Sequence, residues 1–470
     1  PVYPPPPPTF HFSVRSSHPP PLTMRFVLLS LFFTLSLCAL SPVILVPGLG
    51  GSSLQAKLNK RDTASLTAPE QSTEPPSVSS DPWYCFKEWN SWFEIWLAFY
   101  ELVANPCWLR HLRVEYDAAT NTYANATGVQ VAPYEFGSIK AVDYIDHVDD
   151  FFKWTSYFAP LSEALVQAGY EPGKNLFGAP YDWRLDGATL CYNGTFCNDL
   201  QNLVEHAYNV SGGEPVQLVT HSMGGPVTLL WLNNLSPEYK AKYIANFVPI
   251  AAPWSGTAKS LRGILSGDDF GIQLAGLPLL PVKETAALAR QASGVNWLVP
   301  DPQFWPADQP FVTTPSKNYT VHQYGELFAD AHAEPAGLIH ERTTGYISNL
   351  KHPNVPVYCL YGYNQPTEIA YHYNQDLFNE GIEQPVEVDE TDAGDGTVPI
   401  LSLVECANWR STPDHIVDLE VRCREYPMEH AGILSDKDLI ADVVDIVTGK
   451  PFAGCEPVEA LKGFADRRRV

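Results

Sequence analysis

The sequence is short of basic residues and has a single long apolar run. Its 470 residues include 30 Lys and Arg against 53 Asp and Glu, which gives a formal net charge of −23. A nucleic-acid-binding protein needs basic side chains to neutralise phosphates, so this balance argues against such a partner. No CxxC spacing predicts a zinc site. Beyond the first 41 residues, no stretch is apolar for long enough to cross a bilayer.

The long apolar run lies near the start of the chain. Residues 1–23 are Pro-rich and contain no Met, and we interpret them as an upstream or disordered segment. Residues 24–41 open with Met24 and Arg25, continue as an apolar run and end in small residues. This pattern is typical of a signal peptide, the alternative being a signal anchor behind a genuine extension. We therefore expect a protein of the secretory pathway, either lysosomal or extracellular.

Cysteines and glycosylation sequons agree with that route. Cys38 lies in the predicted signal peptide, and an even number of cysteines remains, which indicates disulfides in a secreted chain. Pairing of sequence neighbours would join 85 with 107, 191 with 197, 359 with 406 and 423 with 455, although spacing alone leaves the connectivity open. N-x-[ST] sequons begin at Asn125, Asn193, Asn209, Asn234 and Asn318.

Short apolar runs alternate with helical patterns from residue 42 to about residue 450. Strands are predicted at 42–48, 215–220, 247–251, 355–361 and 416–421, and helices at 155–168, 198–208 and from the Ser222 region to about Leu235. This alternation is typical of an α/β domain with a mainly parallel sheet. Residues 263–345 are rich in Pro and break the rhythm, so we interpret them as a cap. Residues 60–82 are interpreted as a mobile surface insertion, and 451–470 as a C-terminal tail.

The clearest chemical motif is Val-Thr-His-Ser-Met-Gly-Gly at 219–225, between a predicted strand and a predicted helix. A nucleophile elbow requires this setting, in which a sharp turn lifts the Ser222 hydroxyl clear of the sheet. Thr220 stands where the G-x-S-x-G pattern has its first Gly, so the turn must accept a β-branched side chain. The alternative is an ordinary strand–turn–helix with a capping serine. The elbow predicts an α/β-hydrolase fold.

In such a fold an acid and then a histidine follow the nucleophile along the chain. Asp395 lies between two glycines in a loop suited to presenting a carboxylate, with Asp392 as its rival and a turn or weak calcium loop as the alternative. His430 follows the last predicted strand, where the base belongs, whereas His415 opens that strand and is interpreted as structural. The predicted triad is Ser222, Asp395 and His430, with Asp395 holding one tautomer of the histidine.

The tetrahedral intermediate of acyl transfer also needs hydrogen-bond donors. In the elbow, the backbone N–H of Met223 is one expected donor, and the N–H of Leu49, in the loop after the first strand, is the other. Triad chemistry implies no metal and no organic cofactor, so we expect activity that is independent of calcium.

Several motifs follow one another in order between about Pro42 and Gly449. They are VILVPGLGGSSLQAKL at 43–58, the 85–107 segment leading into CWLRHLRVEY, APYDWR at 179–184, THSMGG at 220–225, APWSGTAKSLRGILSGD at 252–268, VYCLYG at 357–362, GDGTVP at 394–399 and EH…IL at 429–434. In these motifs the chain resembles the lecithin:cholesterol acyltransferase family, and most closely its lysosomal phospholipase A2 branch.

This resemblance implies an α/β-hydrolase fold over 42–450 with a cap region and a small membrane-binding subdomain. The family's triad and oxyanion donors fall on the residues chosen above. Its two disulfides fall on Cys85–Cys107 and Cys359–Cys406, and the first closes the segment 83–110 that touches lipid.

Three apolar side chains in that segment become membrane-binding candidates, namely Phe99, Leu102 and Val103. From the residues alone, the apolar spacing of 85–107 is helical and fits a buried core equally well. Leu49 departs from the lysosomal branch, which has a polar residue after Pro-Gly, and the insertion 60–82 has no counterpart in the family.

The function implied is that of a phospholipase and O-acyltransferase. An acyl group would pass from a glycerophospholipid to Ser222 and then to water or a lipid alcohol such as a sterol or ceramide. The partners implied are phospholipid membranes or lipoprotein surfaces. Two alternatives are a strict lipase or phospholipase without transfer, and a catalytically dead lipid-binding protein, against which the intact Ser, Asp and His argue.

Overall fold

A six-stranded parallel sheet forms the centre of the molecule, in the order β17-β14-β9-β8-β1-β7. The computed structural model describes residues 40–59, 89–97, 107–146, 155–268, 273–274, 277–278, 280–347, 349–376, 384–409 and 421–452. The sheet strands are β1 (Val43–Val46), β7 (Leu176–Gly178), β8 (Val216–His221), β9 (Ile244–Ile250), β14 (Val357–Gly362) and β17 (Val421–Tyr426). Every residue of β1 and β8 is buried, because helices cover both faces of a parallel sheet.

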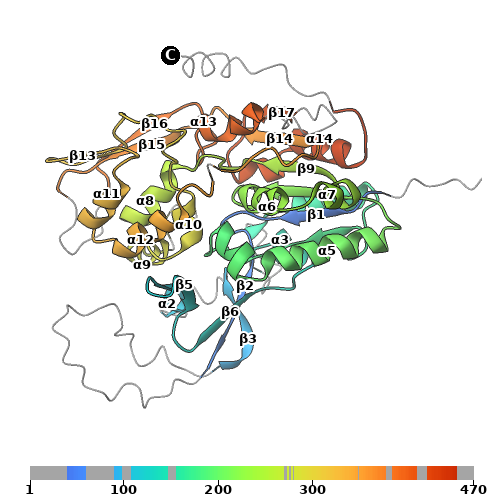
Figure 1. The fold of residues 1–470 in the computed structure, drawn as a ribbon, viewed down its shortest axis with the longest axis horizontal. Coiled ribbons are helices and arrows are strands. Elements are labelled where there is room, and N and C mark those ends of the chain that lie inside the picture. The colour runs from blue at the N-terminus through green and yellow to red at the C-terminus, as the bar shows by residue number, and fades with distance from the viewer. Residues whose placement is uncertain are drawn as a thin grey trace, which may run out of the picture. The chain divides into compact units, whose positions relative to one another are not determined.

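Helices pack on this sheet through apolar faces. They are α3 (Lys140–Asp143), α4 (Ala159–Gln167), α5 (Phe196–Val210), α6 (Gly224–Asn233), α7 (Pro237–Tyr243) and α14 (Lys437–Val447), with α5, α6 and α7 beside the sheet in Figure 1. The α6 helix is buried along nearly its whole length and contacts β1, β8 and β9. The side chain of Asp436 accepts hydrogen bonds from the Asp438 and Leu439 N–H groups and so begins α14. The contacts of α6 with β1, β8 and β9 fix the direction in which α6 leaves β8.

A second apolar core lies apart from the one around the sheet. Its helices are α8 (Ala258–Ser266), α9 (Val282–Ala289), α10 (Ser293–Trp297), α11 (Tyr324–Asp330) and α12 (Glu334–Thr343), which form the yellow and orange group in Figure 1. A small sheet in the order β13-β12-β15-β16 joins them, made of Asn318–Tyr319, Val312–Thr313, Thr367–His372 and Glu387–Thr391. The predicted cap range, 263–345, thus holds four whole helices, while α8 and β15 add residues from outside it.

The predicted membrane-binding segment contains a strand, so the helical spacing of its apolar residues was a wrong guide. The strand β3 (Trp89–Trp96) pairs with β2 (Leu54–Leu58), which also pairs with β6 (Val129–Pro133). Pairing with β2 satisfies the backbone of β3, and this tertiary contact overrides the local period. Phe99, Leu102, Val103 and Cys85 lie outside the described residues, and Cys107 is disulfide-bonded. None of the described helices has the length and apolar character that crossing a membrane requires.

Shorter elements connect these layers. They are α2 (Trp108–His111), the hairpin of β4 (Val114–Asp117) and β5 (Thr122–Asn125), η4 (Thr189–Asn193), β10 (Gln273–Leu274), β11 (Leu277–Pro278), α13 (Ile400–Leu403), η5 (Val404–Asn408) and η6 (Gly432–Ser435).

The predicted strands and helices are found with shifted ends. The helix predicted at 155–168 begins only at Ala159, and the last strand runs over Val421–Tyr426, whereas it was predicted at 416–421. Residues 416–420 lie outside the described part. The disulfide between Cys359 and Cys406 is one that the family resemblance implied, and a second disulfide joins Cys191 to Cys197, a pairing that the sequence left open. The Cys359–Cys406 disulfide closes a 47-residue loop that contains Asp395.

Candidate active site

Ser222 sits on a strained turn between β8 and α6. Its φ angle is +51°, in the left-handed region that non-glycine residues rarely adopt and that a nucleophile elbow requires. The turn needs glycine at 224, because a β-carbon there would lie only 2.4 Å from the Pro47 carbonyl oxygen. Thr220, the departure from G-x-S-x-G, is fully buried, with its hydroxyl oxygen 3.7 Å from where a β-carbon of Gly225 would be. That distance is an ordinary van der Waals contact, whereas the same β-carbon would lie only 2.6 Å from the Ala252 β-carbon, so glycine at 225 leaves room for Ala252.

Three side chains from three distant loops form a continuous hydrogen-bonded row. His430 Nε2 lies 2.9 Å from Ser222 Oγ, and His430 Nδ1 lies 2.7 Å from Asp395 Oδ2. Asp395 is fully buried, and the His430 side chain is 12% exposed. A histidine with a carboxylate on Nδ1 and a hydroxyl on Nε2 can remove the hydroxyl proton as an acyl group arrives.

Main-chain groups hold the carboxylate in place. Asp395 Oδ1 accepts hydrogen bonds from the N–H groups of Thr397, at 3.0 Å, and Val398, at 2.7 Å. The His430 N–H donates to the Asp395 carbonyl oxygen at 2.8 Å, so the acid and base loops are also joined through their backbones. The rival carboxylate, Asp392, is exposed, and His415 lies outside the described residues. The geometry thus pairs His430 with Asp395.

The two predicted oxyanion donors flank Ser222. Met223 is the N-cap residue of α6 and is fully buried, and Leu49 lines the cavity that opens onto Ser222. Within the described part of the chain, neither the Leu49 nor the Met223 N–H donates a hydrogen bond to another group. Both N–H groups are therefore open to an oxygen atom bound next to Ser222.

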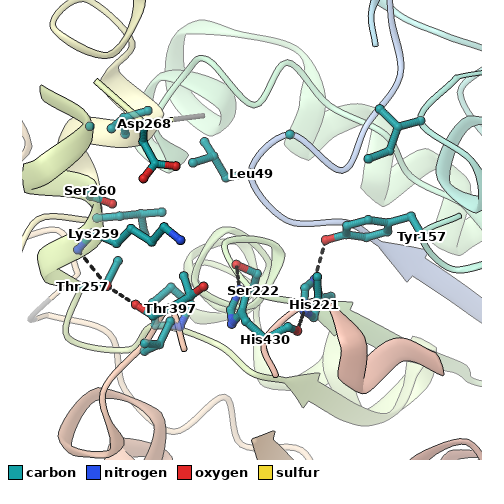
Figure 2. A pocket seen from close by; sticks show the side chains of 18 of the residues that line it. Leu49, Tyr157, His221, Ser222, Thr257, Lys259, Ser260, Asp268, Thr397 and His430 are labelled. Carbon is teal, nitrogen blue, oxygen red and sulfur yellow. Dashed lines mark hydrogen bonds between the residues drawn. The ribbon is translucent and has the colours of Figure 1, made fainter. Parts of the chain in front are cut away.

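An apolar cavity of about 350 Å³ opens onto Ser222 and His430. Its apolar walls come from the loop after β1, from the end of β3 and from the α10 region. They include Leu49, Trp96, Leu97, Ile145, Val295 and Leu298. Figure 2 also shows Lys259 and Asp268 in this cavity, on the side of the second core. A cavity of this size and character suits an apolar chain whose reactive group must meet the Ser222 hydroxyl.

Sequence reasoning missed two polar residues that contact this site. His221 and Tyr157 hydrogen-bond to each other behind the nucleophile, as Figure 2 shows. Burial, and secondarily the nearby His430, hold the pKa of His221 well below its ordinary value. His221 stands inside the quoted THSMGG motif, but nothing in the local sequence near residue 157 indicates a partner 64 residues away.

A parallel sheet with the elbow at the carboxyl end of β8 defines a protein of the α/β-hydrolase class. The family model for lecithin:cholesterol acyltransferase matches residues 92–346 and 341–437. The chain belongs to this family, which confirms the resemblance predicted from the motifs.

Relatives from two named groups cover most of the chain. The rat lysosomal phospholipase A and acyltransferase is 33% identical over 435 residues, which are 92% of this chain and 96% of the relative. The human protein of that name is 33% identical over 411 residues, covering 87% of this chain and 90% of the relative. Mouse phosphatidylcholine-sterol acyltransferase is 33% identical over 383 residues, covering 80% of each chain.

Proposed function

We propose that this protein is a serine-dependent phospholipase A and O-acyltransferase that forms an acyl-enzyme on Ser222. The observation that carries the proposal is the row Ser222–His430–Asp395 opening onto an apolar cavity. His430 Nε2 takes the Ser222 proton while Oγ attacks the ester carbonyl of a glycerophospholipid. The resulting oxyanion accepts hydrogen bonds from the N–H groups of Leu49 and Met223. His430 then protonates the departing lysophospholipid, and the acyl chain stays on Ser222.

The second half of the reaction decides between hydrolysis and transfer. Water, or the hydroxyl of a lipid alcohol, gives its proton to His430 and attacks the acyl-Ser222 carbonyl. Collapse of the second intermediate releases a fatty acid or an acylated alcohol and restores the serine. The apolar walls of the cavity favour a lipid alcohol over bulk water, which supports transfer alongside hydrolysis. The names of both groups of relatives include acyl transfer.

We also propose that the enzyme works at a lipid surface, in the lysosome or outside the cell. The segment 83–110 is the proposed membrane-binding part, with Phe99, Leu102 and Val103 as its interfacial residues. Trp92, on β3 in the same segment, is 47% exposed, which is unusual for so large an apolar side chain. Its indole ring supports docking on phospholipid membranes or lipoprotein surfaces.

Product analysis by mass spectrometry tests this function. The protein and a Ser222→Ala control are incubated with phosphatidylcholine liposomes that contain a sterol and a ceramide, at acidic and neutral pH, with and without a calcium chelator. Free fatty acid together with an acylated sterol or ceramide supports the proposal and identifies the acceptor. Fatty acid and lysolipid alone leave a phospholipase without transfer. Absence of any Ser222-dependent product under all conditions refutes the enzyme assignment.

A further inference from the structure

A second row of hydrogen bonds runs behind the nucleophile. The Gly48 N–H donates to the Tyr157 hydroxyl oxygen at 2.9 Å, and the Tyr157 hydroxyl is hydrogen-bonded to His221 Nδ1. His221 Nε2 in turn lies 2.9 Å from the carbonyl oxygen of His430. Figure 2 shows Tyr157, His221 and His430 joined in this order, beside the loop that carries Leu49. The row therefore links the oxyanion loop to the loop of the base.

Only one arrangement of protons satisfies all these groups when His221 is neutral. A carbonyl oxygen can only accept, so His221 Nε2 must carry the proton and donate to His430. Nδ1 is then an acceptor, and the Tyr157 hydroxyl donates to it while accepting from the Gly48 N–H. Burial favours the neutral forms, since it lowers the pKa of His221 and raises the pKa of Tyr157. The donor and the acceptor of every hydrogen bond in the row are thus determined.

The sheet topology explains why such a link is needed. The oxyanion loop follows β1, next to β8, but the His430 loop follows β17, which is separated from β8 by β14 and β9. The backbone N–H of His430 is held by Asp395, and its carbonyl oxygen is held by His221. Without the second contact, the peptide group before His430 would be held by a hydrogen bond and the peptide group after it would not be held by His221.

The same row positions the oxyanion loop. A β-carbon at Gly48 would lie 2.6 Å from Ser222 Cβ and 3.0 Å from the Tyr157 hydroxyl, so the loop is pressed between the two residues. The Gly48 N–H already donates to the Tyr157 hydroxyl. The next N–H along the chain is that of Leu49, and it is left open to the substrate.

We propose that Tyr157 and His221 are positioning residues that hold the Leu49 N–H and the His430 imidazole in register around Ser222. This inference rests on the proposed function, because the positions of the Leu49 N–H and the His430 imidazole affect kcat only if acyl transfer occurs at Ser222. Loss of a whole oxyanion donor costs about 10²–10³-fold in kcat, so its displacement should cost about tenfold or more.

The first test is Tyr157→Phe, which keeps the partly buried ring and removes only the hydroxyl. Tyr181→Phe is the matched control, since Tyr181 belongs to the same core, is only 1% exposed, and has a hydroxyl that forms no hydrogen bond with the described residues. Hydrolysis of p-nitrophenyl butyrate is measured per active site titrated with a fluorophosphonate. We expect Tyr157→Phe to lower kcat by about tenfold or more with KM changed by less than about twofold, and Tyr181→Phe to match wild type. An unchanged kcat in Tyr157→Phe, or an equal loss in the control, overturns the proposal.

A comparison at His221 covers the case in which a variant folds poorly. His221→Gln keeps an N–H donor near the Nε2 position, whereas His221→Leu removes both polar atoms. We expect a higher kcat per titrated site for the glutamine variant. We also expect the Tyr157→Phe and His221→Leu losses to be strongly non-additive in the double variant, since they break one row. Additive losses, or equal kcat for the two His221 variants, overturn the proposal. If wild type itself has no activity above Ser222→Ala, the proposed function fails instead.

Discussion

Replacing Asp395 with asparagine should stop catalysis by reversing the histidine tautomer. Two main-chain N–H groups, from Thr397 and Val398, point at Asp395 Oδ1. In Asp395→Asn the amide oxygen must stay with these donors, which turns the NH₂ group toward His430 Nδ1. His430 Nδ1 then has to accept, so the proton moves to Nε2, and Nε2 can no longer take the Ser222 proton.

The expected loss is about 10⁴-fold in kcat, the size found for the same change in a serine protease, and corresponds to about 5 kcal/mol in the barrier. Hydrolysis of p-nitrophenyl butyrate measures it without requiring a membrane. The matched control is Asp392→Asn, the same change at the exposed rival carboxylate three residues earlier, which should retain wild-type activity. A thermal melt checks that both variants are folded. If Asp395→Asn kept more than about a tenth of the wild-type kcat, or if Asp392→Asn lost as much, the assignment of the acid would be wrong.

Three further predictions concern stability and membrane contact. Replacing Cys359 and Cys406 together with alanine should lower the free energy of unfolding by about 4 kcal/mol in urea titrations, because their disulfide closes a 47-residue loop; an unchanged midpoint would contradict this. Burial of His340 lowers its pKa from 6.5 to about 4, so the stability it contributes is complete above pH 6.5 and is lost as the pH falls toward 4. His340→Leu should therefore lose about 2 kcal/mol less stability than wild type between about pH 7 and pH 5, and parallel pH profiles would refute this. Trp92→Ser should weaken binding to phosphatidylcholine liposomes about tenfold in a sedimentation assay and leave p-nitrophenyl butyrate hydrolysis unchanged; equal binding would place Trp92 outside the lipid contact.

The fold class and the three side chains of the candidate triad were predicted from the order of residues along the chain. Buried parallel strands read as short apolar runs, and those at β1, β8, β9 and β14 were predicted because burial on both faces leaves this local mark. The elbow is also local, since a strand, Ser222 and two glycines adjoin in the chain. The acid and the base then followed from their order in an α/β-hydrolase.

Which side chains and backbone groups contact one another depends on how the strands and loops pack, and the sequence did not predict it. Asp392 and Asp395 lie in one loop and have similar neighbours in the sequence. Which of the two carboxylates contacts His430 depends on how that loop packs against the loop after β17. The sequence did not predict the β3 strand, because the spacing of its apolar residues is helical, whereas pairing with β2 sets its conformation. The Tyr157–His221 row joins loops that are brought together by the sheet order. Local periodicity records which face of an element is buried, but it does not record the partner, because hydrogen bonds between distant residues form only when the packed sheet places them within reach.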